Sequence, residues 1–250
     1  MKVISYQVSF SSRLLKKIYI FSGVVFLLLL LSAVAWLTLH YLGNEISLSF
    51  RLLLLVVEYV GLGFFYGLLR SSFIDDLVNN LRGKKGEDLV ADILGSHFDG
   101  SYTYIRNYVV PGSAIGDIDG LLVGQNEIII IEVKYFSGEF EIRNGEFYKI
   151  TEKGQYHLWS NPIKQVKKQK DCLLSFLKER SLCIHVRSFV VLVSGRVRRF
   201  QGPTGVYVLN KDNFVDVLNK ETSIDHNLTN QPIQRILDSL INSRHSTPLN

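Results

Sequence analysis

The hydrophobic residues of this chain are unevenly distributed, and their pattern separates a strongly apolar start from a mixed remainder. Residues 18–39 contain no charged side chain, and residues 52–69 contain only Glu58. A helix of about 20 apolar residues, rising about 1.5 Å per residue, spans a hydrocarbon core of about 30 Å. The pattern therefore predicts a transmembrane hairpin within residues 1–70, with spans at about 18–39 and 50–69.

Two other interpretations of these segments stay open. Lys16-Lys17 precede the first apolar run and Ala33-Val34-Ala35 lies within it, which is also the pattern of a cleavable signal peptide. Apolar residues continue past that point, which favours a span. The second segment is shorter and contains Glu58 and three glycines, so a buried helix of a soluble domain is its alternative.

Basic residues flank this hairpin at both outer ends. They are Lys2, Arg13, Lys16 and Lys17 before the first span, and Arg70, Arg82, Lys84 and Lys85 after the second. The short connector at 40–51 carries only Arg51 and Glu45. Cytoplasmic loops are enriched in lysine and arginine. We therefore expect a multi-pass protein of the cell membrane, with the lipid bilayer as a partner and both chain ends in the cytoplasm.

After residue 70 the pattern becomes that of a globular domain. Residues 71–83 are predicted to be a linker, 84–210 the domain, and 211–250 a helical extension with a tail. The predicted strands are 102–110, 117–123, 128–135, 139–142, 146–151, 188–193 and 205–209. They are indicated by runs of apolar and β-branched residues that are bounded by turn residues.

Helices precede, separate and follow these strands. Apolar residues at helical spacing predict a helix at 85–98, and Asn161-Pro162 marks the start of another, with a capping Asn before a first-turn Pro. Further helices are predicted near 211–219 and 231–242. This order predicts an α/β fold with a mixed sheet flanked by helices. The core residues expected in its central strands are Ile129, Ile131, Val133, Val190 and Leu192.

The overall charge changes this picture little. Of the net charge of +5, residues 70–250 carry only +2, so charge alone does not argue for a nucleic-acid partner. Cys172 and Cys183 have no metal-binding spacing and fit ordinary buried thiols in a reducing compartment.

Acidic side chains and a lysine recur on the two strands 117–123 and 128–135. Side chains two residues apart in a strand point to the same face. A hairpin loop centred on Gln125-Asn126 pairs positions whose numbers sum to 251, which places Asp119 opposite Glu132. Directly opposed side chains lie about 5 Å apart at Cβ. Two carboxylates at that separation repel each other, and a buried pair requires a cation between them.

Such a pair suits Mg²⁺, or Mn²⁺ in its place. Mg²⁺ usually takes one or two protein carboxylates and completes its octahedron with water and phosphate oxygens. Lys134 would then position or activate the attacking water and offset charge in the transition state. A solvated polar face of a hairpin is the alternative. Against it, residues 128–131 and Val133 make this strand apolar on both faces, so Glu132 and Lys134 stand where a strand is buried.

These motifs together resemble a known family. The Asp119 … Glu132-x-Lys134 arrangement is similar to the PD-(D/E)XK nuclease core, although Ile118 stands where that motif has proline. More narrowly, the chain resembles the nuclease-related domain (NERD) family over about residues 84–195. The matching pieces are Gly86-Glu87 with Val90, Asp117-Ile-Asp119-Gly-Leu-Leu-Val, Ile131-Glu-Val-Lys134 with Gly138, and Trp159-Ser-Asn-Pro162 with Gln165.

The resemblance implies a restriction-endonuclease-like fold and a catalytic site. Its members would be Glu87, Asp119, Glu132, Lys134 and Gln165, with Asp119 and Glu132 as the metal ligands. For two of them the residues also allow a plainer role. Glu87 suits a helix N-terminus through the helix dipole, and Gln165 suits an exposed helix face. Asp117 occupies a less constrained place in the family pattern.

Basic side chains near this site are candidates for phosphate contacts. They are Lys167 and Lys168 on the second helix and Arg198 after the strand at 188–193. A solvated helix face is the commoner meaning of such a run of lysines.

The sequence therefore predicts a membrane-anchored, Mg²⁺-dependent nuclease that acts on DNA, in preference to RNA, at the cytoplasmic face. Two alternatives stay open. One is a non-catalytic module of the same fold that binds nucleic acid or protein. The other is a small subunit of a membrane complex in which the hydrophobic hairpin is the functional part.

Overall fold

The computed structural model describes residues 1–6, 48–124, 127–158, 160–222 and 233–242, together with scattered residues between 19 and 41. The described chain forms two compact units, one of Met1–Gln7 and Arg82–Asn250 and the other of Val8–Leu81. Parts of the predicted span at 18–39, the Gln125-Asn126 turn, Trp159 and the tail at 243–250 lie outside the described residues.

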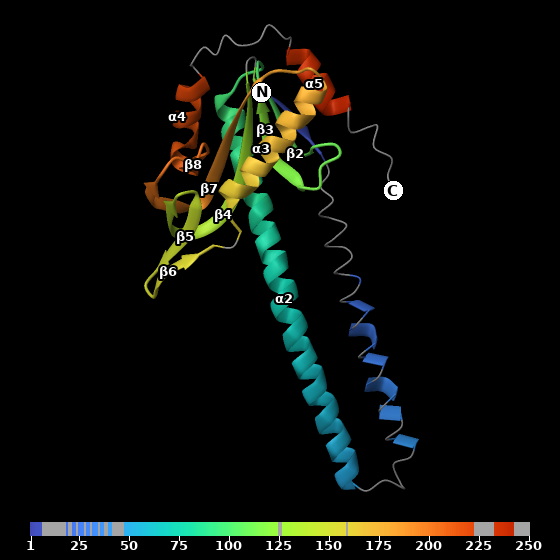
Figure 1. Ribbon diagram of the computed structural model, residues 1–250. Helices are drawn as coiled ribbons and strands as arrows, with labels where there is room; N and C mark the ends of the chain where they lie inside the picture. The colour runs from blue at the N-terminus through green and yellow to red at the C-terminus, as the bar shows by residue number, and fades with distance from the viewer. Residues whose placement is uncertain are drawn as a thin grey trace. The chain divides into compact units, whose positions relative to one another are not determined.

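The long helix α2 (Leu48–His97) contains the second predicted hydrophobic segment and continues into the globular unit. Residues 71–83, predicted to be a linker, are therefore helical (Figure 1). Within the part of the chain that the structure describes, no helix combines the length and the apolar character needed to cross a membrane. The predicted two-span hairpin thus has no support from the described helices.

The globular unit is built on a mixed sheet of eight strands (Figure 1). The strands are β1 (Lys2–Ser5), β2 (Thr103–Val109), β3 (Asp117–Val123), β4 (Glu127–Arg143), β5 (Glu146–Thr151), β6 (Gly154–His157), β7 (His185–Gln201) and β8 (Tyr207–Asn210). Strand β4 is central, antiparallel to β3 and β5 and parallel to β7. The predicted mixed α/β sheet is confirmed, although β1 and β6 were not predicted from the sequence.

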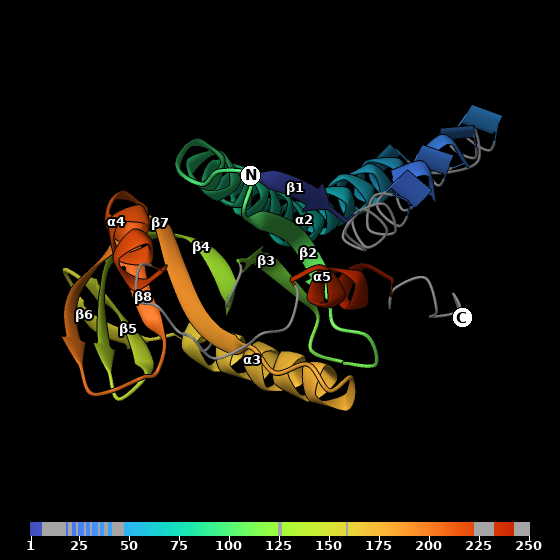
Figure 2. The same ribbon diagram turned by 90° about the horizontal axis from the view of Figure 1, so that it is seen from above.

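Helices cover both faces of this sheet (Figure 2). The remaining helices are α3 (Pro162–Glu179), α4 (Lys211–Thr222) and α5 (Ile233–Asn242). Val90 and Leu94 of α2 and Phe214 of α4 share one core with odd-numbered β4 residues such as Ile131. Helices α3 and α5 share the other core with even-numbered β4 residues such as Ile130. Strand β4 is therefore buried on both faces, as a central strand should be.

The predicted core and hairpin register are both confirmed. Ile129, Ile131, Val133, Val190 and Leu192 are all buried. In the β3–β4 hairpin, Gly120 pairs with Ile131 and Val123 with Ile128, so paired numbers sum to 251. The ladder ends at the Gly120–Ile131 pair, however, so the predicted direct pairing of Asp119 with Glu132 is not formed.

Strand β1 comes from the very start of the chain and pairs in parallel with β2. The amide of Lys2 donates to the Tyr102 carbonyl at 3.1 Å, and the N-terminal ammonium donates to the Phe98 carbonyl at 3.2 Å. Ile4 packs against the main hydrophobic core, whereas Val3 points away and is 51% exposed. The chain start is therefore an edge strand of a domain that otherwise begins at residue 82.

Replacing Ile4 by Asp should lower the free energy of unfolding of the globular unit by about 2 kcal/mol, because its apolar side chain leaves the core. Replacing the exposed Val3 by Asp is the matched control and should change the same quantity by less than about 0.5 kcal/mol. Urea denaturation of the full chain measures both. Equal effects of the two variants would mean that β1 contributes no packing.

Candidate active site

The site is centred on a carboxylate inside the central strand. Glu132 of β4 is completely buried, and its two oxygens have different partners. Oε1 lies 2.5 Å from Lys134 Nζ, and Oε2 accepts a hydrogen bond from Gln169 Nε2 of α3 at 3.1 Å. The same Gln169 nitrogen also donates to the Asp117 carbonyl at 3.1 Å. A buried carboxylate is tolerated only when its charge is compensated in this way.

Asp119 lies where the sheet is interrupted on both sides. The β3–β4 ladder ends at Gly120 and Ile131, and the β2–β3 ladder passes over Asn107 and Asp119 without pairing them. Asn107 has a φ of 53°, a left-handed conformation that asparagine tolerates better than most residues. With its strand partners separated, the Val133 amide donates instead to Asp119 Oδ2 at 2.7 Å. The side chain thus replaces the missing backbone acceptor and is held in the gap between strands.

Two glycines of the sequence motifs are explained by close approaches around this gap. A Cβ atom on Gly120 would overlap the ring and hydroxyl of Tyr104 on the neighbouring strand. A Cβ atom on Gly86 would come within 3.3 Å of the Val133 and Val193 side chains, so glycine lets α2 approach the sheet. Gly120 thus admits Tyr104 beside Asp119, and Gly86 lets the helix that carries Glu87 pack closely on the sheet.

Glu87 reaches the site from α2, opposite the face that carries Gln169. Arg106 of β2 lies 3.8 Å from the Glu87 carboxylate and donates to Asp88 at 2.6 Å. Burial raises the pKa of Glu87 to about 7; Arg106 acts in the opposite direction, and Asp117 and other carboxylates add to the rise. Glu87 therefore changes protonation near neutral pH in the metal-free chain.

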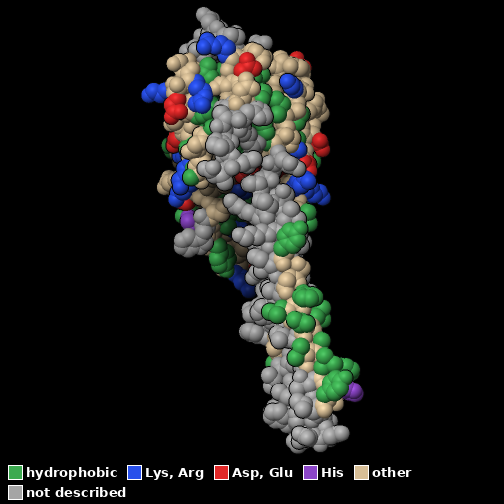
Figure 3. All heavy atoms as spheres, turned by 90° about the vertical axis from the view of Figure 1, so that its right-hand side faces the viewer, with side chains coloured by type: hydrophobic (Ala, Val, Ile, Leu, Met, Phe, Trp, Pro, Cys, Tyr) green, Lys and Arg blue, Asp and Glu red, His purple; other side chains and the backbone are tan. Residues whose placement is uncertain are grey.

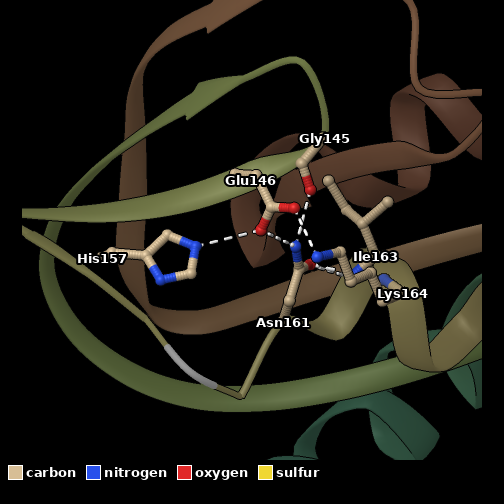
Figure 4. Close-up of polar contacts among 6 residues, drawn as sticks. All are labelled: Gly145, Glu146, His157, Asn161, Ile163 and Lys164. Atoms are coloured by element: carbon tan, nitrogen blue, oxygen red, sulfur yellow. Dashed lines mark hydrogen bonds and ion pairs between the residues drawn. The ribbon is translucent and has the colours of Figure 1, made fainter.

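The start of α3 is anchored by polar contacts (Figure 4). Asn161 caps the helix by accepting from the Ile163 amide at 2.9 Å, while its own Nδ2 donates to the Gly145 carbonyl at 2.7 Å. Glu146 accepts from the same Nδ2 and pairs with Lys164 at 2.5 Å. These contacts lower the pKa of Glu146 to about 2, led by those from Lys164 and His157. The Asn-Pro motif thus ties α3 to β5 and fixes the helix that delivers Gln169.

The charges at the centre of the site affect one another's pKa values. Burial raises the pKa of Asp119 well above its ordinary value, and the Glu132 charge raises it further. Burial also raises the pKa of Glu132, against the effects of Lys134 and Gln169. For Lys134, burial favours the neutral form, but the surrounding carboxylates outweigh it and raise the pKa. Lys134 is therefore a fixed cation that offsets the charge of the carboxylates. In the resting state it is protonated and cannot act as a base.

The structure brings together four of the five predicted catalytic residues: Glu87, Asp119, Glu132 and Lys134. It does not bring in Gln165, which is half-buried one helical turn before Gln169 and makes no side-chain hydrogen bond to these carboxylates among the described residues. Gln169 was missed from the sequence. The available signal was a glutamine on the otherwise apolar stripe of α3, a helix whose buried residues include Val166 and Leu173.

The predicted phosphate-binding residues lie outside this cluster. Lys167 and Lys168 are exposed on α3. Arg198 is exposed on the extension of β7, with its guanidinium 3.6 Å from Glu139. Arg106 was missed from the sequence, where it stands as a single charge inside the predicted strand 102–110.

The donor set fits a divalent cation in part. Among the described residues, no group of three or more acidic, histidine or cysteine side chains is arranged to hold a metal ion. Mg²⁺ needs only one or two protein carboxylates, and Asp119 and Glu132 supply two. Two buried polar atoms beside them, the Tyr104 hydroxyl and Gln169 Oε1, have no hydrogen-bond partner among the described residues. Unpaired buried groups of this kind call for a water or ligand.

In this mixed α/β domain, acidic residues of a β-hairpin lie beside the lysine of an E-x-K motif, where the sheet is interrupted. This arrangement is consistent with the PD-(D/E)XK nuclease-like class. Residues 82–193 match the family model of the nuclease-related domain, which confirms the resemblance seen in the sequence. Neither a curated protein nor a solved structure matched the chain.

The raised pKa of Glu87 makes the stability of the metal-free protein depend on pH. Because the folded state holds this proton more tightly than the unfolded state, stability should fall as the pH rises from about 4.5 to about 7 and then level off. Glu87→Gln removes the titrating group and should reduce this fall by up to about 3 kcal/mol. Urea denaturation in EDTA at several pH values measures it. Identical pH profiles for the variant and the wild type would contradict the assignment.

Proposed function

We propose that the chain is a Mg²⁺-dependent nuclease, with Mn²⁺ as a substitute, that hydrolyses phosphodiester bonds of DNA. The match to the nuclease-related domain supports a nuclease-related function and a nucleic-acid partner. The observation that carries the proposal is the buried Glu132, paired with Lys134 and lying beside Asp119 in the interrupted sheet. Such buried, coupled charges are typical of functional sites and are hard to account for by folding alone.

Asp119 and Glu132 would hold the metal ion. When bound, the ion would supply a Lewis acid for the phosphate and lower the pKa of a coordinated water. The Lys134 ammonium would stabilise the negative charge that grows on the phosphate oxygens, and its raised pKa keeps it charged for that role. Glu87, with a pKa of about 7 in the metal-free chain, is placed to accept or donate a proton at the edge of the site. The exposed Lys167 and Lys168 of α3 and Arg198 of β7 would contact the nucleic-acid backbone.

Mg²⁺ should stabilise the full-length protein against thermal unfolding in proportion to ln(1 + [Mg²⁺]/Kd). Glu132→Gln should abolish this response and any DNA cleavage, because it removes charge from the metal site. Lys134→Met should keep most of the Mg²⁺ response but lower turnover by about 10²-fold or more. Thermal unfolding and cleavage of single- and double-stranded DNA and RNA measure these effects.

The outcome of that experiment separates the competing functions. A wild-type protein with no Mg²⁺ stabilisation up to about 10 mM, a concentration at which a site with a Kd of about 1 mM would be mostly occupied, would exclude the metal-dependent enzyme. Retained nucleic-acid binding would then favour the non-catalytic module. Wild-type behaviour in both variants would mean that Glu132 and Lys134 form only a structural pair.

We also propose that the N-terminal segment anchors the protein in the cell membrane. Residues 18–39 are free of charge. The described side chains of the Val8–Leu81 unit also expose much apolar surface, visible as green atoms in Figure 3. The large exposed hydrophobic residues of this unit include Tyr19, Phe26, Leu29, Leu30, Trp36, Tyr41, Val56, Tyr59 and Val60. Exposed apolar surface of this extent is unusual in soluble monomers and suits a lipid environment.

The pairing of β1 with β2 supports a specific topology for this anchor. Strand β1 precedes both hydrophobic segments, whereas β2 follows both, and the two strands belong to one sheet. If the segments before and after the hydrophobic part of a chain belong to one sheet, they lie on the same side of the membrane. The chain between them then crosses the membrane an even number of times. The pairing thus agrees with the positive flanks, which favour a hairpin with both ends in the cytoplasm.

Thiol labelling in intact cells tests this topology. A cysteine introduced in the connector as Ser47→Cys should react with a membrane-impermeant maleimide. The native Cys183 is exposed on the globular unit, contrary to the buried thiol expected from the sequence. It should react only after permeabilisation because the membrane shields it. Labelling of Cys183 in intact cells would contradict the cytoplasmic placement, and labelling of neither residue would contradict the hairpin.

A further inference from the structure

Gln169 is the one polar side chain on the buried stripe of α3. Its neighbours along the stripe are Ile163, Val166, Leu173, Phe176 and Leu177, and Gln169 itself is completely buried. Methionine or leucine would fill such a position without placing an amide in the core. Burying an amide is unfavourable unless its hydrogen bonds are made, so its contacts should explain its presence.

Both hydrogens of the Gln169 amide are used, and each acts on a different arm of the site. One goes to Glu132 Oε2 at 3.1 Å and the other to the Asp117 carbonyl at 3.1 Å. With Lys134 on Oε1, the Glu132 carboxylate is then fixed from both sides. The bond to Asp117 holds the start of β3, two residues before Asp119, at the point where β3 has left its pairing with β4. Gln169 therefore bonds to both carboxylate-bearing strands across this gap, in addition to the direct bond between the Val133 amide and Asp119.

We propose that Gln169 is the positioning residue of this site, and that it sets the relative orientation of Glu132 and Asp119 for a divalent cation. The inference rests on the proposed function for the identity of the ligand. Its Oε1 atom is buried and has no donor among the described residues. A water molecule of the hydrated cation is a donor of the right kind for this oxygen. Partners that orient metal ligands typically affect metal affinity or activity by about 10- to 100-fold.

The test compares Gln169→Met with Gln165→Met in the full-length protein. The two changes are chemically identical and lie one turn apart on the same helix, but only Gln169 bonds to Glu132. Methionine fills the same volume but leaves Glu132 Oε2 and the Asp117 carbonyl without their donor, so Gln169→Met should lower the metal-free unfolding temperature while the protein still folds. It should raise the Mg²⁺ concentration needed for half-maximal stabilisation by about tenfold or more and lower kcat more than it changes KM. Gln165→Met should leave the unfolding temperature close to that of wild type. It should also leave the half-maximal Mg²⁺ concentration, kcat and KM within about twofold of wild type.

A second measurement does not depend on the metal. The Gln169→Met change should loosen the start of β3 and so free the Asp119 side chain, which accepts a hydrogen bond from the Val133 amide. In the metal-free protein, this amide should therefore exchange faster with deuterium in Gln169→Met than in Gln165→Met. If both the Mg²⁺ response and this exchange are unchanged, Gln169 only fills space and the inference is overturned. If wild type shows no Mg²⁺ response but the exchange difference is found, the positioning role stands and the proposed metal-dependent function falls.

Discussion

The burial of the Glu132 carboxylate in the middle of an apolar strand is the constraint on which the rest of this domain depends. A charge at that place is tolerated only because Lys134 and Gln169 compensate it from the same strand and from α3. Helix α3 must therefore lie at a fixed position over β4, and the contacts of Asn161 with β5 hold its first turn there. The Asn-Pro motif and the acidic motif, 29 residues apart in the chain, thus serve one site.

The second determinant is a defect in the sheet. Backbone donors inside a protein require acceptors, and when β3 separates from β4 the Val133 amide loses its strand partner. Asp119 supplies the replacement, which draws its carboxylate into the gap instead of leaving it on the surface of a strand. Asn107 is left-handed on the other side of this gap, and the absence of a side chain at Gly120 leaves room there for Tyr104. The position of the Asp119 carboxylate is therefore set by the point at which regular pairing between β3 and β4 ends.

The N-terminal strand adds a constraint on the whole chain. Because β1 joins the edge of β2, the chain start and the domain after residue 82 belong to one folding unit, with the Val8–Leu81 unit inserted between them. The entropy of closing such a long connection grows only slowly with its length, so a large insertion is compatible with a stable edge strand. Folding of the globular unit and placement of the hydrophobic segments are then linked through four residues at the chain start.

Local patterns in the sequence predicted most strands and helices of the globular unit, the buried core and the hairpin register, because each depends on periodicity or on turn residues within a few positions. They also singled out Asp119, Glu132 and Lys134 as candidates, whose motifs are short and contiguous, and the family resemblance added Glu87. Other features depend on contacts between segments that are distant in the sequence, and only the tertiary structure decided them. The sequence could not choose between Gln165 and Gln169, since both are glutamines on α3 and only the packing of that helix on β4 brings one of them to Glu132. Strand β1 carries no recognisable pattern in four residues, and it becomes a strand because the edge of β2, about 100 positions later, offers it hydrogen bonds.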